Sequence, residues 1–207
     1  MASLNDIRGL RFGPLGRHMA HICVDMQRLF AEPGEWHTPA LMEIAGAVAR
    51  VAAHRPERAL FSRFLTPQTA GDAHGQWRTY YQRWQAVTGE HLAPGKLDLI
   101  PALARTARPG ALIDKSGHSC FDGKAMRPAL DRLGATGLIV TGVETDVCVL
   151  ATVLDAIDLG YRVVIVEDGV ASSSPEGHAA AMSAIYPRYD QQIEVLTTDN
   201  LLHAWTE

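Results

Sequence analysis

A chain of 207 residues that is 47% hydrophobic and 20% charged is long enough to bury the core of one α/β domain, which we expect to span residues 1–207. Its formal net charge of −4 at pH 7 argues against a nucleic-acid binder that works by neutralising phosphates. No apolar run approaches membrane-spanning length, and residues 1–16 lack the apolar stretch of a leader, so we expect a cytoplasmic protein without a membrane or nucleic-acid partner.

The first third of the chain predicts two strands and one helix. Residues 1–17 contain Gly and Pro and are expected to form an irregular arm. An apolar run over residues 18–24 predicts a buried strand that ends at Asp25. A Thr-Pro pair should open a helix over residues 38–54, whose apolar side chains repeat at helical spacing. Residues 59–64 form the second predicted strand.

The middle of the chain carries an aromatic helix. After a loop with Gly and Pro at 65–75, residues 76–87 predict a helix with aromatic side chains at positions i, i+3, i+4 and i+7. These aromatic residues are Trp77, Tyr80, Tyr81 and Trp84. Such a stripe is typical of a core or a subunit interface, and the alternative is a lid over a substrate site. Residues 98–107 predict a short helical connection, and 111–114 the third strand, which Lys115 ends.

After the third strand we expect a loop and then a helix over residues 124–133. The next stretch, over residues 138–159, predicts a strand, a turn at Gly142 and a helix that contains Cys148. With Thr145 as the helix cap, Cys148 falls in the first turn, where unpaired N–H groups and the helix dipole favour an anion. A thiol placed there titrates lower and is more reactive, and the alternative is a half-buried structural cysteine. The three cysteines are odd in number and far apart, which favours free thiols in a reducing compartment.

The last part of the chain continues the alternation of strands and helices. Residues 161–166 predict the fifth strand, 167–169 a turn, 174–185 a helix and 193–196 the sixth strand, before a short C-terminal helix. This alternation predicts a single-domain α/β fold with a doubly wound, mainly parallel six-stranded sheet, Rossmann-like, with strand order 3-2-1-4-5-6 and helices on both faces.

Three polar residues follow strands one, three and four: Asp25, Lys115 and Cys148. Ligands bind at the carboxyl edge of open α/β sheets, so we expect these residues to meet there. The thiolate would attack an electrophilic carbon, the carboxylate would take the thiol proton and return it to a leaving amine, and the ammonium would hold the carboxylate. The alternative for Asp25 is a hydrogen bond to the following turn.

Four motifs cover roughly residues 20–170 and carry a family resemblance. They are Cys23-Val24-Asp25-Met26-Gln27, Lys115-Ser116-Gly117-His118-Ser119-Cys120-Phe121, Thr141-Gly142-Val143-Glu144-Thr145-Asp146-Val147-Cys148-Val149 with Thr152 and Asp155-Ala156, and Gly160-Tyr161-Arg162-Val163 running to Glu167-Asp168. In this order they resemble the isochorismatase-like cysteine hydrolases, a superfamily that includes nicotinamidase, N-carbamoylsarcosine amidohydrolase, ureidoacrylate amidohydrolase and isochorismatase.

The resemblance implies a catalytic triad of Cys148, Asp25 and Lys115. We expect no cofactor. It also implies a non-proline cis peptide bond between Val143 and Glu144. In this family that bond aims backbone N–H groups, here those of Glu144 and Cys148, at a developing oxyanion.

The chain also departs from the family pattern. Nicotinamidases carry an Asp-x-His pair and a further His for a metal just after strand two, and residues 62–67 here contain none of these ligands. The sequence Asp72-Ala73-His74 has the right spacing but lies further along, in the predicted loop. We therefore expect no metal, which disfavours a nicotinamidase. Isochorismatase itself works without a nucleophilic cysteine, so Cys148 argues against that activity too.

Residues outside the triad suggest what the pocket recognises. Arg63 ends strand two, and its guanidinium could hold a substrate carboxylate by two parallel hydrogen bonds; the alternative is a structural Arg paired with a nearby acid. Trp77, Tyr81 and Trp84 of the aromatic helix could roof the pocket, and His118 is a candidate wall. Together they suggest a small, planar amide or ureide that bears a carboxylate.

The leading expectation is a metal-independent cysteine hydrolase that cleaves a C–N bond of a small amide or N-carbamoyl (ureido) compound through a thioester. One alternative is a non-catalytic small-molecule-binding or scaffold protein. The other is a thiol redox sensor that uses Cys148, with Cys23 or Cys120 as the resolving thiol. We also expect a homo-oligomer, either a dimer or a tetramer.

Overall fold

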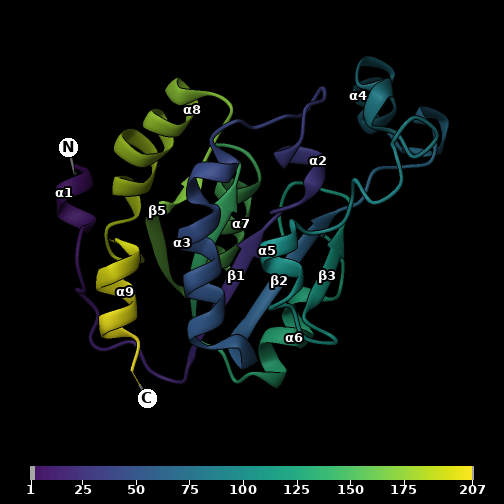
Figure 1. Cartoon of the computed structure of the whole chain (residues 1–207). Coiled ribbons are helices and arrows are strands. Elements are labelled where there is room, and N and C mark those ends of the chain that lie inside the picture. The colour runs from purple at the N-terminus through teal and green to yellow at the C-terminus, as the bar shows by residue number, and fades with distance from the viewer. Residues whose placement is uncertain (1–2, 207) are drawn as a thin grey trace.

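A computed structural model describes residues 3–206, and a six-stranded parallel sheet forms its centre (Figure 1). The strands are β1 (Met19–Val24), β2 (Ala59–Phe64), β3 (Leu112–Lys115), β4 (Gly137–Val143), β5 (Arg162–Ala171) and β6 (Ile193–Leu196). Their order is β3-β2-β1-β4-β5-β6, and every neighbouring pair is parallel. This topology confirms the predicted doubly wound sheet.

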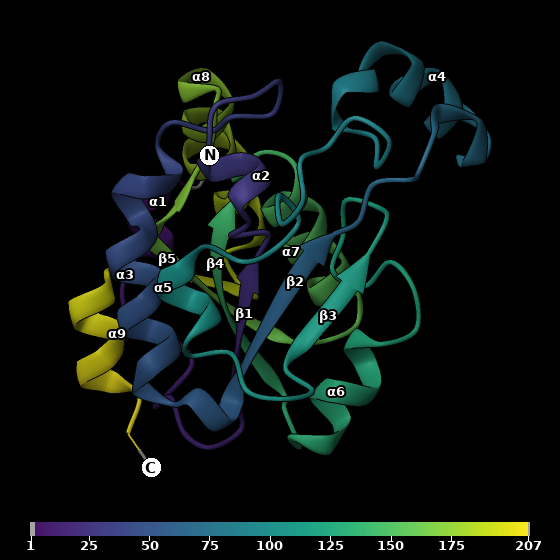
Figure 2. The ribbon, with the colours of Figure 1, turned by 45° about the vertical axis from the view of Figure 1, so that its right-hand side comes forward.

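Helices cover both faces of the sheet. They are α1 (Leu4–Ile7), α2 (Arg28–Ala31), α3 (Leu41–His54), α4 (Gln76–Arg83), α5 (Pro101–Ala104), α6 (Met126–Arg132), α7 (Cys148–Asp158), α8 (Pro175–Ala180) and α9 (Thr198–Ala204). Figure 2 shows α3, α5 and α9 on one face and α6 and α7 on the other. Because both faces are covered, the central strands β1 and β4 are buried along their whole length, which explains their nearly continuous apolar sequence.

The strand register brings the ends of three strands to one edge. Val24, the last residue of β1, pairs with Gly142 near the end of β4, and Phe64 of β2 pairs with Lys115 of β3. Strands β1 and β4 are neighbours at the point where the strand order reverses, which is where open α/β sheets leave a crevice. The residues that follow β1, β3 and β4 therefore gather at the carboxyl edge.

The N-terminal arm is more ordered than predicted. After the short helix α1, Arg8 forms a β-bridge with Val195 of β6, and Leu15 forms another with Trp205. Apart from this helix and these bridges the described part of the arm is irregular, and the buried apolar side chains of Ile7 and Leu15 hold it against the body of the protein. Residues 1 and 2 of the predicted arm lie outside the described residues.

Strand β5 passes through the predicted turn at 167–169. Ile165 pairs with Val140, and Val170 pairs with Gly142. Between these two pairs β5 advances by five positions, whereas β4 advances by only two. The strand absorbs the turn-forming sequence as a bulge and continues to Ala171, which corrects the predicted end at residue 166.

Helix α3 begins at Leu41, later than the predicted start at the Thr-Pro pair. The carbonyl of Thr38 accepts a hydrogen bond from the Leu41 N–H, and the Thr38 hydroxyl donates to Glu144 Oε1 at 2.9 Å. The Thr38 hydroxyl therefore bonds the segment after β4 and does not cap the helix.

The segment between β2 and α5 extends away from the body of the molecule beyond the carboxyl edge of the sheet, and it carries α4 (Figures 1 and 2). The aromatic stripe of α4 packs within its own chain, since the Trp36 ring lies 5.9 Å from that of Tyr80 and 6.3 Å from that of Tyr81. No helix in residues 3–206 combines the length and apolar character that crossing a bilayer would require.

Candidate active site

Cys148 is the first residue of α7, immediately behind the loop that leaves β4. The predicted cap was wrong: Val147 occupies that position, and the hydroxyl of buried Thr145 lies 2.9 Å from His178 Nδ1. The thiol sits at the end of the helix where backbone N–H groups lack helical partners.

Asp25 and Lys115 form a fully buried ion pair at the same edge. Lys115 Nζ lies 2.8 Å from Asp25 Oδ2, and neither side chain is exposed. Ser62 of β2 completes the arrangement, because its hydroxyl donates to Asp25 Oδ1 at 2.6 Å and accepts from the Asp25 N–H at 3.0 Å. The backbone of Asp25 has a φ of +50°, a left-handed conformation that non-glycine residues seldom adopt outside constrained sites.

Lys115 is also held by main-chain oxygens. Its Nζ donates to the carbonyls of Gly117 and His118, at 3.0 and 2.8 Å. Burial is the largest single effect and disfavours its charge, but the Asp25 carboxylate together with the nearby Cys148 and Cys120 sulfurs outweighs that cost and raises the pKa of Lys115. The ammonium is therefore charged at neutral pH and fixed at the centre of the cluster.

The Cys148 thiol does not titrate low, as its helix position suggested. The residue is only 7% exposed. Burial is the largest effect on its thiol and raises the pKa of Cys148, and the nearby Asp25 carboxylate raises it further. The charge of Lys115 lowers the pKa but does not offset these two effects. The expectation of a depressed pKa was wrong because burial and the Asp25 carboxylate together raise the pKa of Cys148. The resting group is a thiol, so its reaction needs a base that removes the proton.

His118 lies beside the thiol, with its Nδ1 3.8 Å from the Cys148 Sγ. Burial and the charge of Lys115 lower the pKa of His118, which keeps the imidazole neutral at pH 7. The ring also packs against Trp77, with centroids 5.0 Å apart.

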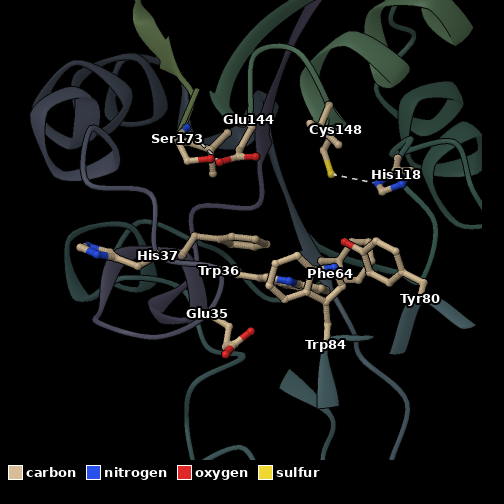
Figure 3. Close-up of a pocket in the computed structure, with 13 residues that line it drawn as sticks. Glu35, Trp36, His37, Phe64, Tyr80, Trp84, His118, Glu144, Cys148 and Ser173 are labelled. Carbon is tan, nitrogen blue, oxygen red and sulfur yellow. Dashed lines mark hydrogen bonds between the residues drawn. The ribbon is translucent and has the colours of Figure 1, made fainter. Parts of the chain in front are cut away.

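A cavity of about 210 Å³ opens onto the Cys148 thiol. Figure 3 shows the thiol and Glu144 on one side and a group of aromatic rings on the other. The lining residues are Phe30, Glu35, Trp36, His37, Phe64, Tyr80, Trp84, His118, Val143, Glu144, Val147, Cys148 and Ser173. The cavity is small and largely aromatic, which suits a small organic ligand.

Glu144 and Cys148 each carry a backbone N–H group without a backbone acceptor in the described part of the chain. The peptide bond between Val143 and Glu144 is cis. Within residues 3–206, neither the N–H of Glu144 nor that of Cys148 donates to another backbone group. Both residues line the cavity.

The other predicted substrate-binding residues are divided between different places. Trp84 and His118 line the cavity at the thiol, whereas Trp77 and Tyr81 line a neighbouring cavity of about 340 Å³. Arg63 lies in neither; its Nε and Nη2 donate to the two carboxylate oxygens of Asp114 at 2.7 and 3.0 Å. The assignment of Arg63 to the substrate pocket is therefore corrected, because the side chain at this strand position pairs with its neighbour on β3.

A family model described as the isochorismatase domain matches residues 19–200 of the chain. The chain belongs to the isochorismatase family. The family match covers all six strands and the residues Asp25, Lys115 and Cys148.

Curated members of the isochorismatase family show what this chain is similar to. It is 28% identical over 185 residues to ureidoacrylate amidohydrolase RutB of Methylobacterium radiotolerans, and this alignment covers 79% of the chain and 71% of that protein. It is 27% identical over 203 residues to a probable inactive nicotinamidase of Arabidopsis thaliana, covering 92% of the chain and 96% of that protein. A shorter match, 39% identical over 71 residues, to the uncharacterized isochorismatase family protein PncA of Bacillus subtilis covers 34% of the chain and 39% of that protein.

Among solved structures, a cysteine hydrolase from Pseudomonas syringae pv. phaseolicola superposes with a TM-score of 0.73. It is 22% identical and covers 95% of this chain and 97% of that one. At 22% identity, this similarity is evidence for a shared fold alone.

In this isochorismatase-family chain the two residues with metal-ligand spacing, Asp72 and His74, lie away from the thiol. Asp72 Oδ2 accepts from the Thr69 N–H and hydroxyl at 2.9 and 2.8 Å, and with His74 it lines the neighbouring cavity rather than the one at the thiol. In the part of the chain that the structure describes, no three His, Cys, Asp or Glu side chains form a group able to hold a metal ion. No step of the mechanism below therefore passes through a metal.

Sequence reasoning missed several residues of the site. Ser62 could have been found as a small polar residue that follows the apolar run at the start of the second strand. Trp36 and Glu35 lie in a loop between α2 and α3, where no periodicity marks them. Only the folded chain brings that loop across from Cys148.

Proposed function

We propose that this protein is a cysteine amidohydrolase that cleaves a C–N bond of a small amide or N-carbamoyl compound. The observation that carries the proposal is the buried Asp25–Lys115 pair beside a thiol that opens into a small cavity. A fully buried ion pair is costly to desolvate, and a purely structural role for it is weakly motivated. The names of relatives such as the ureidoacrylate amidohydrolase support the same chemistry.

The first half-reaction forms a thioester. Asp25 removes the proton from the Cys148 thiol, whose raised pKa makes a base necessary. The sulfur attacks the carbonyl carbon of the substrate, and the carbonyl oxygen becomes an oxyanion. The N–H groups of Glu144 and Cys148 donate to that oxyanion. When the C–N bond breaks, Asp25 returns the proton to the leaving nitrogen, and ammonia or an amine departs.

The second half-reaction hydrolyses the thioester. Asp25 now takes a proton from a water molecule, which attacks the same carbon through a second oxyanion at the same N–H groups. The sulfur leaves as a thiolate and recovers the proton from Asp25. Lys115 keeps the carboxylate in place throughout and offsets the negative charge that moves between oxygen and sulfur.

One relative is named as a probable inactive nicotinamidase, so a non-catalytic binding protein is the second candidate. A redox sensor is less favoured, because Cys23 and Cys120 are both fully buried and line no part of the cavity. The three free cysteines agree with the proposed cytoplasmic location. A homo-oligomer remains a prediction, as does the absence of a metal and of nucleic-acid or membrane partners.

A panel of small amides and ureides assayed for release of ammonia tests the proposal. Cys148→Ala should abolish turnover, and Asp25→Asn should lower kcat by about 10²–10⁴, the usual range for a positioned proton-transfer group. Lys115→Arg should also lose most activity, because the planar guanidinium cannot reproduce the contacts of Nζ in a closed site.

Two further measurements make that test specific. Iodoacetamide should modify Cys148, located by peptide mass spectrometry, before Cys23 or Cys120, and circular dichroism should show that each variant is folded. Near-normal turnover by folded Cys148→Ala protein would refute the mechanism. Absence of turnover across the whole panel, with ligand binding retained, would favour the non-catalytic candidate.

A further inference from the structure

The charged side chains that line the cavity have one sign. They are Glu35 and Glu144; none of the described lining residues is Arg or Lys, and the lining histidines are His37 and His118. The nearby Lys115 is fully buried and paired with Asp25, and Arg63 is paired with Asp114 outside the cavity. His118 is neutral because burial and Lys115 lower its pKa. The acidic side chains of the lining therefore have no Arg or Lys among the described lining residues to offset their negative charge.

Glu144 is held in place with one oxygen available. Its Oε1 accepts hydrogen bonds from the Thr38 hydroxyl and the Ser173 N–H, both at 2.9 Å, and no donor among the described residues bonds Oε2. Glu35 is an exposed residue of the loop that carries Trp36, and no ion pair of the described chain involves it. Both carboxylates are thus able to accept bonds from a ligand.

The aromatic wall reinforces this preference for positive charge. The Trp36 ring lies 5.7 Å from Phe64 and 5.9 Å from Tyr80, and Trp84 lines the same cavity (Figure 3). Two cations of the protein already sit over rings of this wall: Lys115 Nζ lies 4.6 Å from the Phe64 centroid and the Arg83 guanidinium 5.3 Å from that of Trp84. Aromatic faces attract cations through their negative quadrupole.

We propose that the substrate carries a protonated amine at the end remote from the scissile amide, an inference that rests on the proposed amidohydrolase function. The carbonyl group lies at Cys148, and the ammonium group lies between the Glu35 and Glu144 carboxylates and the faces of Trp36 and Trp84. A carboxylate at that end would meet the like charges of Glu35 and Glu144, and none of the described lining residues is an Arg or Lys that could pair with it. This substrate charge is the opposite of the one that Arg63 suggested from the sequence.

The test compares three amides of equal length that end in a primary amine, a hydroxyl group and a carboxylate. We expect kcat/KM to be at least about 10-fold higher for the amine than for the hydroxyl compound, and lowest for the carboxylate. Added salt should reduce kcat/KM for the amine and leave the hydroxyl compound nearly unchanged. Equal rates for the amine and the hydroxyl compound, or a preference for the carboxylate, would overturn the proposal.

Glu35→Gln gives the residue-level test, because Glu35 lies in the cavity but outside the triad and the backbone donors. It should lower kcat/KM roughly 3–10-fold more for the amine than for the hydroxyl compound. Glu57→Gln is the matched control, since Glu57 precedes β2 at the opposite edge of the sheet. A loss of equal size on both substrates would contradict a charge-specific role.

Binding to Cys148→Ala protein separates this proposal from the proposed function. In calorimetry the amine compound should bind at least about 10-fold more tightly than the hydroxyl compound without being turned over. If the wild-type protein hydrolyses neutral amides but shows no preference for the amine, only the charge proposal fails. If it hydrolyses no amide but still binds the amine selectively, the catalytic proposal fails and the charge preference stands.

Discussion

His21 offers a direct test of how this core responds to acid. The imidazole lies in the middle of β1, fully buried, and its Nε2 is 2.8 Å from the Thr141 hydroxyl, while Nδ1 has no partner among the described residues. Burial alone lowers the pKa of His21 from its ordinary 6.5 to about 3. Protonation would place an unpaired charge between two central strands.

The lowered pKa of His21 makes the free energy of unfolding depend on pH. A histidine whose pKa falls on folding binds fewer protons in the folded state, so its contribution to stability is complete above pH 6.5 and is lost as pH falls toward 3. Each pH unit in that window removes about 1.4 kcal/mol from the free energy of unfolding, or about 2–3 kcal/mol by pH 4.5. That loss is a large fraction of the roughly 5–15 kcal/mol typical of a folded domain.

Urea unfolding followed by tryptophan fluorescence, at pH 7 and pH 4.5, measures this loss. The reference variant is His21→Gln, whose amide has similar length, can bond the Thr141 hydroxyl and does not titrate. The wild-type protein should lose about 2–3 kcal/mol more than His21→Gln between the two pH values, whatever the carboxylates contribute to both. Equal losses in the two proteins would refute the reasoning.

Substitutions at two glycines and one serine give three further predictions. Gly142 has a φ of +112°, and a Cβ there would collide with the Val24 carbonyl oxygen, so Gly142→Ala should cost more than about 3 kcal/mol or prevent folding. Gly46→Ala, at an uncrowded position in α3, should instead be neutral or stabilise by about 0.5–1 kcal/mol in the same unfolding assay. Ser62→Ala removes the hydroxyl that positions Asp25 and should lower kcat about 10-fold with little change in KM, at a stability cost of about 1–3 kcal/mol. Full activity of folded Ser62→Ala protein would remove that positioning role, and easy tolerance of Gly142→Ala would contradict the close approach of β1 and β4.

The sheet was predictable because its central strands β1 and β4 are buried on both faces. Runs such as residues 138–141 have no polar alternation, and strands of this kind occur in parallel sheets covered by helices. Once the strand order is known, the residues after β1, β3 and β4 must meet at one edge. The meeting of Asp25, Lys115 and Cys148 therefore followed from local sequence and topology alone.

The protonation and the surroundings of those residues required the tertiary structure. The sequence placed Cys148 at a helix start, which favours a thiolate, but the pKa depends on how much water the folded chain removes, and burial raises it. Arg63 could equally have faced a ligand or an acid until the register of β2 and β3 set Asp114 beside it. Glu35 and Trp36 reach the site through a loop without periodicity, so only the folded chain shows that acids and aromatic rings face the thiol. Local patterns determine strands, helices and their ends, whereas charge and solvation at a site depend on atoms that are distant in the sequence.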